Sequence, residues 1–590
     1  MRTPKSAAIA KRDPRYGAGV TASPTVEMCA ALLTVALGIV VYIPALSNGF
    51  VWDDPLVLVQ LRAMHGLGDL IVMPPQIPRF YYRPLIFVSY LVDRALGGET
   101  PFWFHGSVVA VHSLNCLLVF HLAKKLFRAD VAVATISGAL FAVLPTHVES
   151  VAWMAGRSDV VVCTFLLSTA LLAMKRDVPW SGWLAGLTLF LALLSKELAV
   201  AGLLLIPALD WLDARQLYWN RYVPLVLATM IYLVLRHGSV GSVVGGVAAD
   251  ASVAALLINL SRAMGFYLVL SIVPFGVSPL IAALPTTALY PIAALAIAVA
   301  CGAALYRYWP QSRWPFAFLA TWFVVTLAPS LAVILRTSVS APLADRYLYV
   351  PSVATCVLVA AGITFAGRRW RLAMPIYVAV VLPLILGLGI ATAMSTHVWA
   401  DNLSFWSKAA LDNPQNAMAA RELGTALLAN GRLDDAERFF KTALALSSSD
   451  TERAQTYNQL GLVYRRREQF NDAATAFQSG LAIASHPMLF HNLGLTLMAK
   501  AELDQRRGDK AAVAVDVRQA RDALESALKT PAGQNTLEWD PAKTHALLGQ
   551  VLIALNERSA AREHLETALR LQPTGPAADV TRSQLRQINP

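Results

Sequence analysis

The chain has 590 residues, of which 56% are hydrophobic and only 15% are charged. Soluble domains carry about 25% charged residues, so much of this chain lies in a lipid bilayer. The formal net charge is +11, but the basic residues collect at the ends of apolar segments, where membrane orientation explains them without nucleic acid. The five cysteines lie in apolar segments, and their spacing fits neither a disulfide framework nor a metal cluster.

An acidic pair follows the first apolar run. Residues 28–48 are long enough to cross a bilayer as one helix, and their length and weak cleavage site argue against a cleaved signal peptide. Asp53 and Asp54 come within two turns of the predicted membrane edge. Two like charges are unfavourable there, which indicates a function, although the pair could instead cap a helix in the loop.

Ten further apolar runs have a length suited to crossing a membrane. They cover residues 105–123, 129–147, 158–174, 180–195, 198–212, 219–236, 287–306, 314–334, 347–366 and 372–395. Another run, 255–274, contains Asn259, Arg262 and Pro274 and is ambiguous.

Basic clusters at alternate junctions between these runs predict an orientation. They are Arg2, Lys5, Lys11, Arg12 and Arg15, then Lys124, Lys125 and Arg128, then Lys175 and Arg176, then Arg215 and Arg221, then Arg307 and Arg313, and finally Arg368, Arg369 and Arg371. The positive-inside rule places these clusters in the cytoplasm, provided that 255–274 does not cross. We therefore expect 255–274 to be a re-entrant or surface-lying helix on the outer face. The prediction is about 11 spans in the cell (inner) membrane, with a cytoplasmic N-terminus and an extracytoplasmic C-terminus.

Ionisable and aromatic residues gather on the face that this orientation places outside. The candidates are Asp53, Asp54, Arg83, His147, Glu149, Arg157, Asp159, Lys196, Glu197, Asp345, Arg346 and Tyr347. Ionisable groups near a bilayer are rare and usually functional, so clusters in four loops on one side predict one shared pocket.

Structural explanations for these residues remain open. His147 and Glu149 could end a solvated loop, or could join Asp159 in a divalent metal site, although their spacing is a weak metal signal. Lys196 could pair locally with Glu197. Asp345 and Arg346 could form a similar local pair.

After Trp399 the composition changes to a pattern of about 34 residues. Leucine–glycine pairs recur and are followed by small and large apolar residues at fixed spacing, at 423–424, 460–461, 493–494 and 548–549. This predicts about four tetratricopeptide units, with an insertion near 500–515 that lengthens helices or forms a loop; the alternative is a plain helical bundle. Such a solenoid offers a concave face to a protein or peptide.

The predicted fold class is all-α, with a polytopic transmembrane bundle followed by an α-solenoid. Its segments are a cytoplasmic tail at 1–26, a membrane domain at 27–396, a linker at 397–414, the repeats at 415–580 and a tail at 581–590.

Five segments of the membrane half resemble a known family. They are NGFVWDD at 48–54, YRPL at 82–85, LPTHVESVAWMAGRSD at 144–159, SKE at 195–197 and ADRY at 344–347. In order and spacing they are similar to integral-membrane glycosyltransferases of the GT-C fold, most closely the transmembrane and tetratricopeptide repeat-containing O-mannosyltransferases and their bacterial relatives. The segment 238–250 departs from the family pattern, which leaves the identity of the sugar open.

The resemblance implies transfer of a hexose such as mannose from a polyprenyl-phosphate-linked sugar to an acceptor hydroxyl on a protein or peptide, outside the cytoplasm. It also implies an acidic residue in the first outer loop that activates the acceptor. Asp53 or Asp54 would be the base, and Lys196, Arg346, Arg157 and Arg83 would bind the donor phosphate. The other candidates would line the pocket. No cofactor is assigned, and a divalent metal is left open.

Two other classes of function compete with this interpretation. An O-antigen-ligase-like or polysaccharide-assembly membrane protein would place its key arginine and histidine residues in a large late outer loop, whereas here the acidic pair comes in the first. The other class is a transporter or a non-enzymatic membrane scaffold with repeats. A transporter should show paired hydrophobic halves or broken helices, and this sequence shows no such symmetry.

Overall fold

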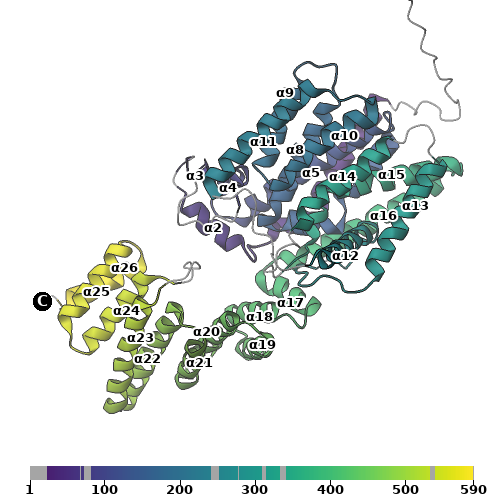
Figure 1. Ribbon diagram of the computed structural model, residues 1–590. Helices are drawn as coiled ribbons and strands as arrows, with labels where there is room; N and C mark the ends of the chain where they lie inside the picture. Colours follow the sequence, from purple (N-terminus) through teal and green to yellow (C-terminus); the bar gives the residue numbers. More distant parts are fainter. Residues whose placement is uncertain are drawn as a thin grey trace, which may run out of the picture. The chain divides into compact units, whose positions relative to one another are not determined.

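The computed structural model describes residues 23–588, except 65, 67, 72–80, 241–251, 277, 309–313, 333–340 and 532–538. In these residues the secondary structure is helical apart from one isolated antiparallel bridge between Ile281 and Leu343. The chain divides into two compact units, 1–408 and 409–590 (Figure 1). The predicted fold class, an all-α membrane bundle followed by an α-solenoid, is confirmed.

Most long helices of the first unit follow the predicted apolar runs, whereas the helices at 54–62, 68–71, 84–97, 148–152 and 402–412 lie outside those runs. Their bounds are α1 Pro24–Val40, α2 Asp54–Arg62, α3 Gly68–Ile71, α4 Pro84–Gly97, α5 Pro101–Leu126, α6 Val131–Ala142, α7 Val148–Ala152, α8 Arg157–Ala173, α9 Ser181–Leu193, α10 Gly202–Ala214, α11 Trp219–Val240, α12 Val253–Ile272, α13 Leu289–Tyr308, α14 Trp314–Leu331, α15 Ser352–Arg369, α16 Met374–Ser395 and α17 Asn402–Asp412. Short 3-10 turns connect several of them, at Ile43–Ser47, Pro145–His147, Met154–Gly156, Glu197–Ala201, Asp345–Leu348 and Thr396–Trp399.

Fewer helices satisfy a strict length criterion than the 11 predicted spans. Seven helices in the described part are long and apolar enough to cross a membrane, and the bent pair of α6 with 145–152 would make eight. The helix α9 has 13 residues, about 20 Å at 1.5 Å per residue, which is shorter than the hydrocarbon core.

The run at 255–274 differs from one of its two expected forms. It forms α12, an unbroken 20-residue helix that is itself long and apolar enough to cross a membrane. A re-entrant segment turns back within the bilayer, so that form does not fit. Tyr267 on α12 is tied to the segment 344–347, because its hydroxyl donates to the Ala344 carbonyl at 3.1 Å. A surface-lying position on the outer face remains a prediction.

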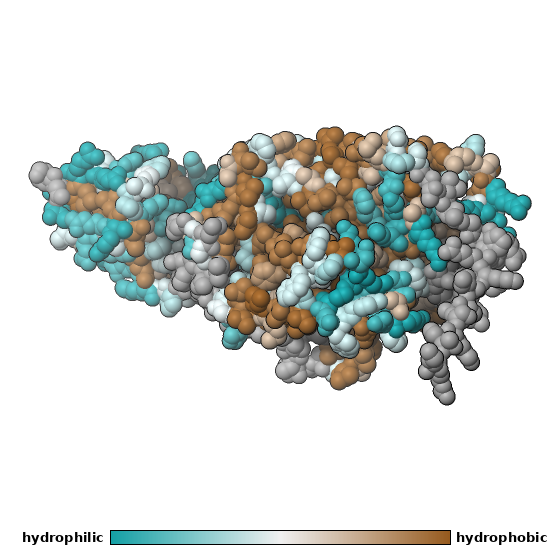
Figure 2. Space-filling view, turned by 90° about the horizontal axis from the view of Figure 1, so that it is seen from above, coloured by the Kyte–Doolittle hydropathy of each residue, from teal (hydrophilic) through white to brown (hydrophobic). Residues whose placement is uncertain are grey.

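The first unit presents apolar side chains on its surface (Figure 2). Exposed residues of α16 include Ile376, Val378, Val380, Leu382, Leu386 and Ile390. Exposed residues of α11 include Val223, Val226, Leu227, Met230, Ile231 and Val234. An apolar surface of this extent is unstable in water and indicates contact with lipid acyl chains.

The described residues of the second unit form four helix pairs and a terminal helix. The bounds are α18 Ala417–Ala429 with α19 Leu433–Leu446, α20 Asp450–Arg466 with α21 Phe470–Ile483, α22 Pro487–Arg507 with α23 Lys510–Lys529, α24 Pro541–Ala554 with α25 Arg558–Leu571, and α26 Pro576–Ile588. The insertion near 500–515 lengthens α22 and α23. The expected linker at 397–414 contains α17, and the expected tail at 581–590 continues α26 to Ile588.

Each pair closes where a glycine of its first helix meets a large side chain of its second. A Cβ on Gly461 would lie 2.6 Å from ring carbons of Phe477, which is closer than atoms approach without displacement. The glycine therefore lets the Phe477 ring lie directly on the backbone of α20. Gly424 meets Phe440 in the same way, which accounts for the spacing seen in the sequence.

Candidate functional site

Asp54 is buried at the first residue of α2. One of its carboxylate oxygens accepts the backbone N–H of Val51 at 3.0 Å. The other accepts the backbone N–H of Ala155 at 3.0 Å. Burial raises the pKa of Asp54 to about 7, while the two backbone bonds oppose that rise. Its carboxylate thus joins the turn before α2 to the turn before α8.

Asp53 has different surroundings. It occupies the position before α2, but its side chain makes no capping hydrogen bond, so the capping explanation does not account for it. The side chain is exposed to solvent, yet loss of hydration beside the surrounding loops raises the pKa of Asp53, and Arg346 lowers it. Asp53 is therefore the member of the pair that is available to another molecule.

Arg346 is held by Glu149. Its guanidinium forms an ion pair with one oxygen of Glu149, and its backbone N–H donates to the other oxygen at 2.9 Å. Burial alone would lower the pKa of Arg346, but Glu149 raises it, so the guanidinium stays charged. Glu149 is buried, and it is a structural partner of Arg346 rather than the end of a solvated loop.

Lys196 pairs with Asp159 and not with its neighbour Glu197. Its Nζ donates to the two Asp159 oxygens at 2.6 and 2.7 Å. Burial lowers the pKa of Lys196, Asp159 raises it, and the nearby Arg83 and Arg346 lower it further. The ring centroid of Tyr347 is 5.8 Å from the Lys196 Nζ and 5.2 Å from the Arg346 Cζ, so this ring lies beside both cations.

Glu197 bridges two arginines from different parts of the chain. Arg83 Nη2 donates to it at 2.9 Å, and Arg236 Nη1 on α11 donates at 2.8 Å. Burial would raise the pKa of Glu197, but Arg83 and Arg236 lower it to about 2. The local Lys196–Glu197 pair considered from the sequence is therefore wrong.

These seven side chains form what we call the charged cluster: Arg83, Lys196, Arg236, Arg346, Glu149, Asp159 and Glu197. It contains four cations and three carboxylates, and the Asp53 carboxylate lies within electrostatic reach of Arg346. Arg83 and Arg346 keep 21% and 22% of their side chains exposed. The cluster can therefore offer charge-assisted donors to an anion.

Arg157 is not available to an external anion. It is 2% exposed, its Nη1 donates to Asp93 at 2.6 Å, and its Nη2 donates to the Phe104 carbonyl at 2.8 Å. Its guanidinium also lies over the ring of Tyr90, 4.3 Å from the centroid. Arg157 holds α4, α5 and α8 together, so we remove it from the predicted phosphate-binding set.

His147 also lies inside the bundle rather than in a pocket. Its Nδ1 contacts the Phe141 carbonyl at 3.0 Å, and its Nε2 contacts the Ser352 hydroxyl at 2.7 Å. Because Glu149 and Asp159 have separate cationic partners, these three residues do not form the metal site considered from the sequence. Across the described residues no group of three or more potential ligands lies close enough for a metal ion.

Asp345 is buried beside the charged cluster and not in it. Its Oδ2 accepts the backbone N–H of Ser278 at 3.1 Å. This contact and the Ile281–Leu343 bridge join the segment after α12 to the loop that carries Arg346.

Sequence reasoning missed Arg236. It lies near the end of α11, a helix counted as one apolar span, and its charge was attributed to no site. The signal was available, since an arginine within a spanning helix generally has a partner or a function. Tyr232, one turn earlier, has its hydroxyl 3.2 Å from Arg236 Nη1.

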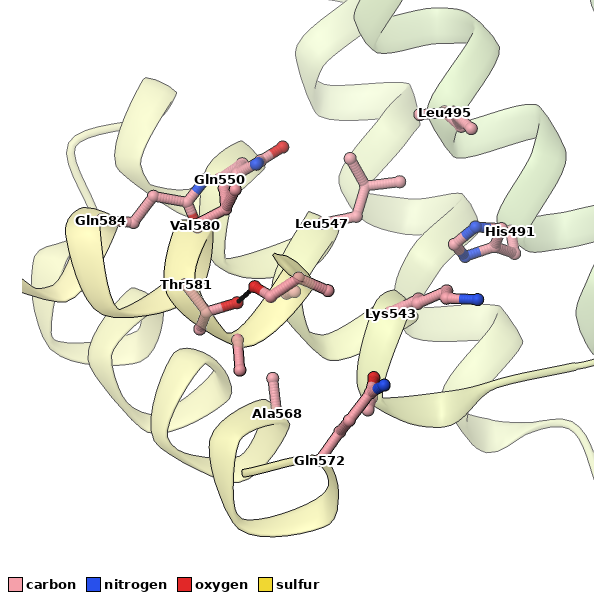
Figure 3. A pocket seen from close by; sticks show the side chains of 14 residues that line it. His491, Leu495, Lys543, Leu547, Gln550, Ala568, Gln572, Val580, Thr581 and Gln584 are labelled. Atoms are coloured by element: carbon pink, nitrogen blue, oxygen red, sulfur yellow. Dashed lines mark hydrogen bonds between the residues drawn. The ribbon is translucent and has the colours of Figure 1, made fainter. Parts of the chain in front are cut away.

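The repeat unit contains a cavity of its own. Its volume is about 280 Å³, and it lies among α22, α24, α25 and α26. Figure 3 shows His491 and Lys543 near one another on one side of it, with Thr581 and Gln584 on the other. The lining combines aliphatic residues with the amides of Gln550, Gln572 and Gln584.

Together these features define a polytopic membrane protein with a charged cluster beside a free carboxylate and a tetratricopeptide-repeat domain. Two family models described as tetratricopeptide repeat match residues 415–486 and 542–574. A plain helical bundle is therefore wrong for the second unit.

Sequence comparison relates up to 71% of the chain to a named group. The protein O-mannosyl-transferase Tmtc1 of Drosophila melanogaster is 33% identical over 198 residues, which are 30% of this chain and 22% of that protein. A protein O-mannosyl-transferase of Caenorhabditis elegans is 24% identical over 455 residues, which are 71% of this chain and 63% of that protein. The chain is thus similar to the transmembrane and tetratricopeptide repeat-containing O-mannosyltransferases, as its motifs predicted, and it spans less than two thirds of these relatives' length.

One solved structure with likeness across the chain is that of ArnT from Cupriavidus metallidurans bound to undecaprenyl phosphate. It aligns with 92% of this chain and 80% of its own, at 13% identity and a TM-score of 0.36.

Proposed function

We propose that this protein is a membrane glycosyltransferase of the GT-C type that moves a hexose such as mannose from a polyprenyl-phosphate donor to a hydroxyl group of a protein. The observation that carries the proposal is the free carboxylate of Asp53 beside the charged cluster. The relatives named O-mannosyltransferases support the reaction class.

Asp53 is the general base of this reaction. The acceptor hydroxyl must lose its proton as its oxygen attacks the anomeric carbon, and a carboxylate with a raised pKa accepts that proton efficiently. Asp54 is less suited to this role, because it is fully buried and each of its oxygens already accepts a backbone hydrogen bond. Asp54 instead holds the loop that presents Asp53.

The charged cluster stabilises the departing phosphate. As the glycosidic bond breaks, negative charge develops on the lipid phosphate, and preorganised cations stabilise that charge. Arg346 and Lys196 lie beside the same Tyr347 ring, and Arg346 also acts electrostatically on Asp53. Arg83 and Arg236 add two further cations to this group, and both donate hydrogen bonds to Glu197.

The repeats present the protein acceptor. The basic clusters predict that the acidic pair and the repeats are both extracytoplasmic, in the cell (inner) membrane. Tetratricopeptide solenoids expose a concave surface suited to extended peptides, and the 280 Å³ cavity offers apolar and amide contacts for one.

Transfer from defined donors tests the proposal. The purified chain should transfer sugar from a polyprenyl-phosphate hexose to a peptide hydroxyl, and a nucleotide hexose should not replace the lipid donor. A panel of lipid-linked sugars that includes mannose identifies the sugar. Failure with every lipid-linked hexose, in protein shown to be folded, would reject the reaction class.

A further inference from the structure

The residue before Asp53 has a strained backbone. Trp52 has a φ of +54°, in the left-handed region that bulky residues rarely adopt. The other non-glycine residues with positive φ in the described part follow the ends of helices, at Arg128, Ala129, Arg215, Arg371, Glu468 and Asn556. Left-handed residues at helix ends are ordinary, whereas Trp52 precedes a helix. Its conformation must be held by its surroundings.

The segment after the last membrane helix holds this turn. The side-chain oxygen of Asn402 accepts the backbone N–H of Trp52 at 2.9 Å. The Ala400 carbonyl accepts the backbone N–H of Gly49 at 2.8 Å. The Thr396 carbonyl accepts the side-chain amide of Asn48 at 3.2 Å. Three hydrogen bonds thus join 396–402 to the turn that leads to Asp53, across about 350 residues of chain.

The aromatic rings of Trp153, Phe405 and Trp406 pack around the Trp52 side chain. The Trp52 ring stacks on Trp153, with centroids 5.0 Å apart and planes 16° apart. It also meets Phe405 at 5.3 Å and Trp406 at 6.2 Å. The other stacking partner of Trp153 is Trp399, at 5.6 Å. The ring is fixed on several sides, which leaves the backbone of residue 52 little freedom.

The aromatic stack also contacts the charged cluster. The guanidinium carbon of Arg346 lies 5.3 Å from the Trp153 ring centroid. A shift of Trp52 would therefore move Asp53 on one side and disturb Arg346 through Trp153 on the other.

We infer that Asn402 is a positioning residue for the proposed reaction: by holding Trp52 in its left-handed conformation, it fixes the Asp53 carboxylate relative to Arg346. This inference rests on the proposed function for its kinetic consequence only. The structural part, that 396–406 belongs to the catalytic unit and clamps the 48–54 turn, stands by itself. No sequence signal marks this segment, which reads as a linker.

Removal of the Asn402 side-chain oxygen, which accepts the hydrogen bond from Trp52, tests the inference. In Asn402→Ala, Trp52 loses its partner and the turn can relax, so Asp53 shifts. A misplacement of about 1 Å can reduce turnover by about 10²-fold, so we expect kcat to fall at least tenfold with little change in the KM for the donor. The acid limb of the pH–rate profile should move to higher pH, because Asp53 moves away from the cation that lowers its pKa. Asn402→Asp retains an acceptor oxygen and should restore most of the rate.

The matched control is Asp401→Ala. Asp401 accepts the backbone N–H of Ser404 at 2.8 Å and so caps the same helix without a contact to Trp52. Equal loss of kcat in Asp401→Ala and Asn402→Ala would show that only the stability of α17 matters and would overturn the inference.

Hydrogen exchange separates this inference from the proposed function. Exchange of peptides covering 48–56 should be slow in the wild type and in Asn402→Asp and faster in Asn402→Ala, whether or not transfer is detected. If exchange is faster in Asn402→Ala and the wild type transfers no sugar, the clamp is upheld and the proposed glycosyltransferase activity is rejected. Unchanged exchange and unchanged kcat in Asn402→Ala would reject the clamp.

Discussion

Asp53 and Asp54 are neighbours in the chain, and their hydrogen bonds separate their roles. Asp54 is bound by two backbone N–H groups, and Asp53 is exposed and uncapped. The same distinction applies to the arginines, because Arg157 is enclosed by its partners whereas Arg83 and Arg346 retain solvent contact. At this scale, burial and hydrogen bonding decide which charged residues can act on a substrate.

The pH dependence of transfer should depend on Arg346. The base acts in its deprotonated form, so the rate rises with pH through the pKa of Asp53. Loss of hydration beside the surrounding loops raises this pKa, and Arg346 lowers it. Arg346→Gln removes the opposing charge, and the acid limb of kcat/KM should move to higher pH. Arg128→Gln, which removes an exposed charge at a predicted cytoplasmic position, should leave the limb in place. An unmoved limb in Arg346→Gln would show that Arg346 does not act on the base.

The donor affinity should depend on Lys196. Lys196→Ala alone would leave Asp159 buried and unpaired, at a cost of about 3–5 kcal/mol, so the informative variant is Lys196→Ala with Asp159→Ala. Loss of one charge-assisted bond, about 1.5–3 kcal/mol, predicts a donor KM raised roughly 10–150-fold.

The repeat unit contains a comparable ion pair that serves as the control for this experiment. Lys500 and Asp516 form a similar ion pair at 2.9 Å with a buried carboxylate. Lys500→Ala with Asp516→Ala should leave the donor KM unchanged. A donor KM that rises equally in both double variants would indicate general destabilisation rather than phosphate binding.

At the scale of helices, the sequence predicted most elements and missed those whose role depends on distant partners. Apolar length located α5, α11 and α16, and the 34-residue period located the repeat pairs. The helix α17 was missed because its composition is that of a linker, and its contacts with Trp52 come from 350 residues earlier. Arg236 was missed for the same reason, because its partner Glu197 lies on a different element.

The close approach within each repeat gives a prediction at this scale. Gly461→Ala would place a methyl group 2.6 Å from the Phe477 ring, and overpacking of this kind costs about 1–3 kcal/mol. Limited proteolysis and hydrogen exchange should show loosening of α20 and α21. Gln478→Ala, on the exposed side of α21, should show none. Equal protection in Gly461→Ala and wild type would mean that the two helices separate without cost.

For the whole molecule, the order of segments predicted two units, while the exact boundary needed the structure. The compact division falls at 408–409, and the residues just before it hold the turn of Asp53. The repeats proper begin with α18. We therefore propose that the catalytic part of the chain extends through α17, and that the part that presents the acceptor begins after this helix.

Two truncations test this division. A chain that ends at residue 414 keeps the 396–406 clamp and should transfer sugar to a small acceptor, while transfer to a full-length protein acceptor falls. A chain that ends at residue 396 loses Asn402 and the aromatic stack and should lose both activities. Loss of both activities already at 414, in folded protein, would mean that the repeats complete the active site.

The most direct test of the central claim compares Asp53→Asn with Asp54→Asn, using a polyprenyl-phosphate hexose and a peptide acceptor. General-base catalysis contributes about 10²–10⁴-fold, so Asp53→Asn should lower kcat by that factor, with normal folding and donor binding. Asp54→Asn leaves a buried N–H group unsatisfied and should mainly lower thermal stability, by about 1–3 kcal/mol. Near-normal kcat in folded Asp53→Asn would contradict the assignment of Asp53 as the base.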